Sequence, residues 1–241
     1  MAIEILKTPN IICNEGIKFQ TDDIIIQELI DNYVQVIENS QSEENLKLFR
    51  RNISKLRIEY KYILFGLIAN ILKKRTAAQY YLEDNKISMY PLNKKYFGYN
   101  ISYNTEDFIQ DLYHELLHMS STIIYRDNTI VYSGFSQVGG NIPIGVALDD
   151  GYTELLLYRL FNLNKEYMSY KYEVLISSLI EGIISIEKMN NLYFNANLYG
   201  LVEELQKYNT RENVIKFLED LDSIYVIEGR KNYKKEKKTF F

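Results

Sequence analysis

Several residue types are scarce in this chain of 241 residues, and each scarcity excludes something. Cys13 is the only cysteine, so no disulfide can form within the chain. The first ten residues lack the basic and apolar segments of a signal peptide, so we expect a cytoplasmic protein, with export by another route left open. The longest strongly apolar run, residues 63–72, is shorter than the roughly 20 residues that cross a bilayer. We therefore expect no membrane-spanning segment.

The charge balance is not that of a protein that binds nucleic acid. The net charge is −4 and the isoelectric point is about 5.4, whereas proteins that contact many phosphates are usually basic. The basic cluster RKNYKKEKK, residues 230–238, is interpreted as a solvated tail. The oligomeric state is not indicated by the sequence.

Proline and glycine are rare, with three and eleven residues, so long helices are expected. Apolar residues make up 46% of the chain, which is enough to bury a real core. We predict a single α+β domain over residues 1–241, mainly α, with a small sheet near its central helix. Its parts would be an N-terminal helical part (1–75), a core (76–165), a C-terminal helical part (166–228) and a basic tail (229–241).

Local patterns place the elements of the first half. Helices are expected to start near residues 21–23 and 42–44, where polar capping residues precede apolar residues at helical spacing. The almost wholly apolar stretch 60–74 fits a buried helix better than a strand. Residues 77–103, rich in tyrosine and isoleucine, fit two or three short strands.

The second half is predicted to be mostly helical. A helix is expected over about residues 104–121, followed by a hairpin that turns at Asp127-Asn128 and by a second helix over about 149–161. After residue 166 the pattern is helical to about Tyr225, with breaks near residues 190–197 and at Asn209-Thr210.

Residues 111–121, DLYHELLHMSS, hold the only two histidines of the chain, His114 and His118. On a helix, residues four apart lie on one face, so both imidazoles can bind one ion. Zn²⁺ accepts such nitrogens at about 2.0–2.1 Å. Glu115 is offset by one position, from where its carboxylate can take a proton from a water on the ion. The pattern predicts a zinc site with Glu115 as general base, because a chance pair of histidines would not require a glutamate at position 115.

Two histidines do not make a tight zinc site, so a third ligand is needed. No other histidine exists, and the longer pattern HExxHxxGxxH fails, with Ser121 and Ile124 at its glycine and last histidine positions. The third ligand must then be a carboxylate on another element. Residues 147–156, ALDDGYTELL, offer Asp150 and Glu154, which lie four apart on the second predicted helix.

This pair of motifs resembles the gluzincin metallopeptidases, the group that includes thermolysin and the zinc aminopeptidases. It is also similar to small bacterial proteins with a motif like LNEGYTELL after HELLH. The resemblance covers about residues 105–161 and implies a zincin-like catalytic core.

Carried over position by position, the resemblance implies that His114 and His118 bind zinc and that Glu115 is the general base. It implies Asp150 as the third ligand. It also implies that Glu154 holds the outer ring nitrogen of His114, a contact that fixes the orientation of the ring.

The chain departs from the family at the third ligand, where Asp150 stands in place of a glutamate and is shorter by one methylene. Three outcomes are open. Asp150 binds because Gly151 lets the helices lie closer, Glu154 binds in its place, or the site is weakened. Asp149 is expected to cap the second helix.

Hydrolysis also needs a hydrogen-bond donor for the developing oxyanion. With no histidine left, Tyr152 and Tyr132 are the candidates nearest in sequence, although tyrosines more often have core or surface positions. Peptides can be held on an exposed strand edge by backbone pairing, and residues 129–135 or 85–90 could supply such an edge.

The sequence thus predicts a zinc-dependent peptidase that acts on a peptide or protein substrate, with no nucleic-acid or membrane partner. Two alternatives stay open. One is a metal-binding interaction protein without turnover, which the departure at Asp150 and the lack of an obvious oxyanion donor favour. The other is a regulatory protease that cuts a single partner protein.

Overall fold

The computed structural model describes residue 5 and residues 19–21, 23–60, 78–89, 106–124, 130–139, 143–163 and 168–238. Three predictions lie outside these stretches: the helix in the apolar stretch after residue 60, the later strands of residues 90–103, and the turn at Asp127-Asn128.

Two helices open the described chain. α1 (Ile24–Ser40) starts at Asp23, whose carboxylate accepts hydrogen bonds from two amides of the first turn. α2 (Glu43–Ile53) starts at Ser42, whose hydroxyl accepts one. Both predicted helix starts are confirmed.

A three-stranded sheet comes next, formed by β1 (Arg57–Tyr60), β2 (Ala78–Tyr81) and β3 (Lys86–Met89). β3 is the central strand, parallel to β1 and antiparallel to β2, from which it is separated by the short 3₁₀ helix η1 (Leu82–Asp84). The sequence does not predict β1, so the N-terminal part supplies a strand as well as helices. Because β1 occupies one side of β3, β2 is an edge strand within the described residues.

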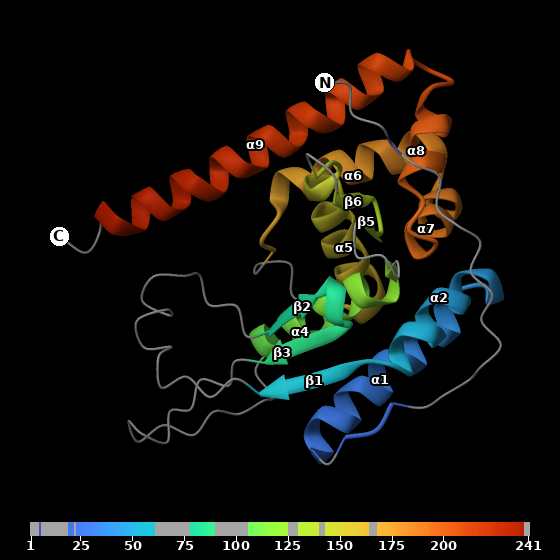
Figure 1. Ribbon diagram of the computed structural model, residues 1–241, viewed down its shortest axis with the longest axis vertical. Coiled ribbons are helices and arrows are strands. Elements are labelled where there is room, and N and C mark those ends of the chain that lie inside the picture. Colours follow the sequence, from blue (N-terminus) through green and yellow to red (C-terminus); the bar gives the residue numbers. More distant parts are fainter. Residues whose placement is uncertain are drawn as a thin grey trace.

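The sheet packs through β2 against α4 (Glu106–Ser120), the helix that carries both histidines (Figure 1). A second sheet follows α4 at once, with the antiparallel order β4 (Thr122–Ile124), β5 (Ile130–Ser133) and β6 (Ser136–Gly139). The sequence predicts β4 and β5 as a hairpin but misses β6.

The remaining elements are five helices: α5 (Val146–Phe161), α6 (Lys171–Ile184), α7 (Ile186–Phe194), α8 (Leu198–Leu205) and α9 (Arg211–Lys238). α5 is central and contacts α4, α6 and α9. α9 is the long helix that crosses one side of the molecule in Figure 1, and it continues to Lys238, through the residues interpreted from sequence as a tail.

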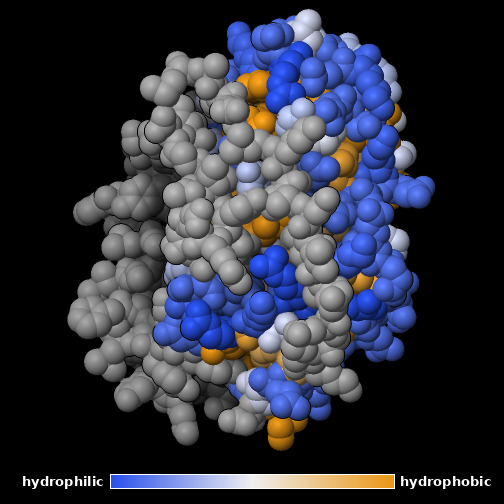
Figure 2. Space-filling view, turned by 45° about the vertical axis from the view of Figure 1, so that its right-hand side comes forward, coloured by the Kyte–Doolittle hydropathy of each residue, from blue (hydrophilic) through white to orange (hydrophobic). Residues whose placement is uncertain are grey.

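Within the described stretches the protein has eight α-helices and two small three-stranded sheets, so the mainly helical α+β class is confirmed. One large core joins α1, α2, α4, α5, α7 and α8, and its largest fully buried side chains include Tyr33, Phe49, Tyr152 and Tyr193. Figure 2 shows that hydrophilic residues cover most of the coloured surface on that face. Among the described helices, none is both long and apolar enough to cross a membrane.

Candidate metal centre

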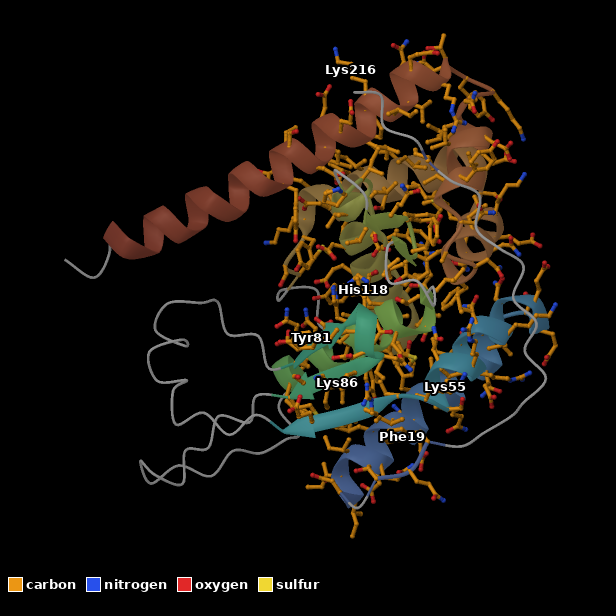
Figure 3. All side chains as sticks on the ribbon, viewed as in Figure 1. Phe19, Lys55, Tyr81, Lys86, His118 and Lys216 are labelled. Carbon is orange, nitrogen blue, oxygen red and sulfur yellow. The ribbon has the colours of Figure 1, made fainter. Side chains whose placement is uncertain are left out.

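The two histidines lie one turn apart on α4, as their spacing predicts. The helix is held in the core by Leu112, Leu116 and Met119, each fully buried. His114 Nε2 and His118 Nε2 are 3.1 Å apart, and His118, which is partly buried, is labelled in the middle of the view in Figure 3. Both imidazoles therefore direct the same ring nitrogen to one point.

Asp150 of α5 completes a group of three at that point. Its Oδ1 is 3.3 Å from His118 Nε2, and one ligand atom from each of His114, His118 and Asp150 lies within 4.8 Å of the other two. Ligands at about 2.0–2.1 Å from a tetrahedral zinc ion are separated by roughly 3.4 Å. Two of the three separations, 3.1 and 3.3 Å, are close to this value and the third lies within 4.8 Å, so the group could hold a metal ion.

The outer ring nitrogens of both histidines are held by carboxylates of α5. His114 Nδ1 lies 3.0 Å from Glu154 Oε2, and His118 Nδ1 lies 3.2 Å from Asp149 Oδ2. A proton on each Nδ1 makes these contacts hydrogen bonds and leaves both Nε2 atoms as lone pairs that face each other. Two lone pairs at 3.1 Å repel unless a proton or a cation lies between them, so this contact suits either a shared proton or a metal ion.

These two carboxylates are themselves fixed. Glu154 Oε1 accepts hydrogen bonds from the Ser169 amide at 2.9 Å and from the Gln110 side chain at 3.4 Å. Asp149 Oδ1 accepts one from the Phe135 amide at 3.0 Å. The Asp149 oxygen that faces His118, Oδ2, also accepts a hydrogen bond of 3.4 Å from the Ser136 hydroxyl. Glu154 uses Oε2 for His114 and Oε1 for the scaffold, which leaves it on the outer nitrogen of His114.

The turn between β5 and β6 shapes the pocket for Asp149. Gly134 has a φ of 48°, in the left-handed region, and a Cβ at this position would lie 2.0 Å from Asp149 Oδ1. Only glycine therefore lets the turn bring the Phe135 amide against the carboxylate.

The acids of α5 change the protonation of the histidines. Burial lowers the pKa of His118, but the hydrogen bond and charge of Asp149, followed by those of Asp150, outweigh it and raise the pKa well above 6.5. His114 shows the same balance, with Glu154 as the main opposing group, and its pKa is also raised. The group therefore favours a positive charge at its centre.

Glu115 lies beside this group and bonds to the edge strand. Its Oε2 accepts a hydrogen bond of 2.7 Å from the Tyr80 amide of β2. Burial raises its pKa, and the charges of His114 and His118 oppose that rise in part. A carboxylate with a raised pKa next to a cation site has the properties of a general base.

Gly151 permits a close helix approach, although not toward α4. A Cβ on Gly151 would lie 2.5 Å from the backbone of Glu173 in α6. The space that this glycine leaves therefore lets α6 pack on α5.

Two sequence predictions at this site are wrong. Asp149 does not cap α5: the helix begins three residues earlier, at Val146, with Gly145 at the N-cap, and Asp149 is turned inward to His118. Neither predicted strand edge is an edge, because the predicted segments hold β3 (Lys86–Met89) and β5 (Ile130–Ser133), each the central strand of its sheet. The edge next to Glu115 is β2.

The predicted oxyanion donors lie elsewhere. The Tyr152 hydroxyl bonds to Glu181 and Asn190 of α6 and α7. Tyr132 is buried in a separate small cluster with Leu48 and Ile123. The structure brings neither hydroxyl to the group of three.

Two other tyrosines adjoin the group and are missed by sequence reasoning. The Tyr170 ring stacks on His114 with 5.6 Å between ring centroids. The Tyr225 hydroxyl donates a 2.6 Å hydrogen bond to Asp150 Oδ2, and its ring lies 6.1 Å from that of Tyr170. Neither residue belongs to a motif, and nothing local in the sequence marks them among 22 tyrosines.

No protein-family model, no curated protein and no solved structure matches this chain. The functional assignment therefore depends on the residues and geometry of the site.

Proposed function

We propose that the protein is a zinc-dependent peptidase with a zincin-like core, as the resemblance to gluzincins implies. One observation carries the proposal: two Nε2 atoms 3.1 Å apart and a carboxylate oxygen 3.3 Å from one of them converge beside the half-buried Glu115. Among the described residues three side chains converge at this point, which fits a catalytic site that keeps a fourth position open.

The donor set supports zinc over other common ions. Two imidazole nitrogens and one carboxylate suit Zn²⁺, whereas Mg²⁺ and Ca²⁺ prefer all-oxygen sites with more ligands. When bound, zinc supplies a Lewis acid that acidifies a water molecule and polarises a peptide carbonyl.

Glu115 is the proton carrier in this proposal. Tyr80 holds its Oε2, so Oε1 is the oxygen that takes the proton from the attacking water and passes it to the leaving nitrogen. Because burial raises the pKa of this carboxylate, it is a better base than an exposed glutamate once it is ionised.

The edge of β2 is the surface proposed to hold the peptide. The Tyr80 amide points to Glu115 and away from β3, and successive residues of a strand alternate in direction. The backbone groups of Ala78 and the carbonyl of Tyr80 therefore face the outer edge, while the Tyr80 amide is used by Glu115. An extended peptide added to this edge would lie next to the general base.

Tyr170 is the proposed oxyanion donor. Burial raises its pKa, and the negative charges of Asp150 and Glu115 raise it further, so its hydroxyl keeps the proton. A neutral phenol over His114 is a suitable donor for an oxyanion at the metal.

The test compares wild type, Glu115→Gln and the exposed control Glu203→Gln, each loaded with zinc, on a peptide library read by mass spectrometry. We expect all three to hold one zinc ion. We expect Glu115→Gln to lose about 10²- to 10⁴-fold in kcat, as is typical when a general base is removed. Equal cleavage by wild type and Glu115→Gln would contradict the proposal.

A second assay, on a cell extract, separates the two rival functions, because neither of them cleaves the peptide library. The short Asp150 favours a metal-binding protein without turnover, which would hold zinc and cleave nothing. A protease for a single partner would also spare the library, and it would cut one protein in a cell extract in a Glu115-dependent manner.

A further inference from the structure

α5 is the helix that carries Asp150. Its first turn has no cap from its own segment. Its N-cap residue is Gly145, with a φ of 82° and no side chain to accept the free amides. An uncapped helix start leaves amide groups without partners, which costs stability.

A residue of α9 supplies the missing cap. Asp222 accepts hydrogen bonds from the Gly145 amide at 2.7 Å and from the Ala147 amide at 2.8 Å, one on each carboxylate oxygen. The carboxylate also lies at the positive end of the α5 dipole. A helix more than 60 residues later in the chain thus fixes the backbone just before Asp150.

The same face of α9 contacts the metal ligand itself. Tyr225 follows Asp222 by three residues, so both lie on one face of the helix. The Tyr225 hydroxyl donates to Asp150 Oδ2 at 2.6 Å, while Asp150 Oδ1 faces His118 Nε2 at 3.3 Å. The tyrosine therefore holds the oxygen that does not face the histidine.

We propose that Asp222 and Tyr225 are positioning residues of the metal centre and that α9 is part of the site. An aspartate has one methylene less than a glutamate, so its backbone must lie at a fixed and closer place to bring Oδ1 to the ion. Asp222 fixes that backbone, and Tyr225 selects which oxygen binds and keeps the other from the ion.

This inference rests on the proposed metal site but not on turnover. The experiment therefore measures metal binding, with Co²⁺ as the probe because its visible absorption reports coordination. Tyr225→Phe removes only the hydroxyl, and Asp222→Ala removes the cap. The matched controls are Tyr208→Phe and Asp220→Asn, both on exposed side chains, with Asp220 also on α9.

We expect Tyr225→Phe and Asp222→Ala to bind Co²⁺ about 10- to 100-fold more weakly, as is usual when an outer partner of a ligand is lost. We expect the absorption spectrum of bound Co²⁺ to change in Tyr225→Phe, and Asp222→Asn, which keeps one acceptor oxygen, to recover part of the affinity. The controls should match wild type. A loss of stability alone would leave the spectrum of the bound ion unchanged.

Three outcomes are decisive. Affinity and spectrum like wild type in Tyr225→Phe overturn the positioning role and leave the proposed peptidase intact. A wild-type protein that binds Co²⁺ and shows the expected variant effects but cleaves no peptide supports the positioning role and contradicts the peptidase. A wild-type protein that binds no Co²⁺ overturns both.

Discussion

His118 is tied to Asp149 by a contact of 3.2 Å between Nδ1 and Oδ2. The two residues come from different helices, and the second oxygen of the same carboxylate is occupied by the Phe135 amide at 3.0 Å. Asp149 thus connects the imidazole of a candidate metal ligand to the turn between β5 and β6. The ring orientation of His118 is set by the scaffold before any ion binds.

Asp149→Asn should weaken zinc binding about 10- to 100-fold, the usual effect of losing an outer partner of a histidine ligand. An asparagine has a single acceptor oxygen, which cannot serve both His118 and the Phe135 amide. Competition with a chromophoric chelator would measure the dissociation constant. Zinc affinity equal to that of wild type would show that this contact does not orient His118.

Gly134→Ala should lower the free energy of unfolding by about 2–4 kcal/mol, because it adds an overpacked methyl group to a left-handed backbone position. The new Cβ would lie 2.0 Å from Asp149 Oδ1 and 2.5 Å from the ring of Tyr193. Urea unfolding of the metal-free protein measures the change.

Gly182→Ala is the matched control. Gly182 lies in α6, and a Cβ there meets nothing within 4 Å. The same chemical change should raise the free energy of unfolding by about 0.5–1 kcal/mol, because alanine loses less backbone entropy in a helix. If both substitutions had the same sign, crowding at Asp149 would not explain the requirement for Gly134.

The contacts that sequence reasoning predicts are those within one helix. His114 and His118 share a face of α4 because of their spacing, and Asp150 and Glu154 share a face of α5 for the same reason. A spacing of four residues on a helix is enough to place two side chains on one face, and this spacing is visible in the sequence.

The contacts that sequence reasoning misses join segments far apart in the chain. Tyr80 is 35 residues before Glu115, and Tyr225 is 75 residues after Asp150. The sequence predicts Asp149 as a helix cap because acids are favoured at helix starts. Its side chain instead points into the molecule, and this position depends on Gly134 and the Phe135 amide. No local pattern encodes such pairings.

Strand order is missed for a related reason. The tyrosine and isoleucine content of residues 77–103 predicts short strands, but it cannot say that β1 pairs in parallel with β3 and leaves β2 outside. The choice depends on a strand from the N-terminal part, 18 residues before β2, so the edge beside Glu115 is visible only in the fold.

Tyr170→Phe should lower kcat on a cleaved peptide by about 10²- to 10³-fold, with little change in KM, if its hydroxyl stabilises the oxyanion. The control is Tyr172→Phe, two residues later, because Tyr172 is 66% exposed and its ring does not adjoin His114. Steady-state kinetics of both variants measures kcat and KM. An unchanged kcat in Tyr170→Phe would remove this residue from the proposed mechanism.

The stability of the metal-free protein should fall as the pH rises above 6.5. Burial lowers the pKa of His118, but Asp149 and Asp150 raise it well above its ordinary value, so the folded state holds a proton that the unfolded state has released. This contribution is fully present below pH 6.5 and is lost as the pH rises through the raised pKa. His114 acts in the same direction, because its pKa is also raised.

Zinc should reverse this trend, because a metal ion takes the place of the proton between the rings and binds only unprotonated Nε2 atoms. Urea midpoints measured from pH 6 to 9, with a chelator and with excess zinc, should therefore diverge as the pH rises. Asp149→Asn, which weakens the support for a charged His118, should flatten the curve of the metal-free protein. A midpoint of the metal-free wild type that rises over this interval would contradict the assignment of His118 and Asp149 as a coupled pair.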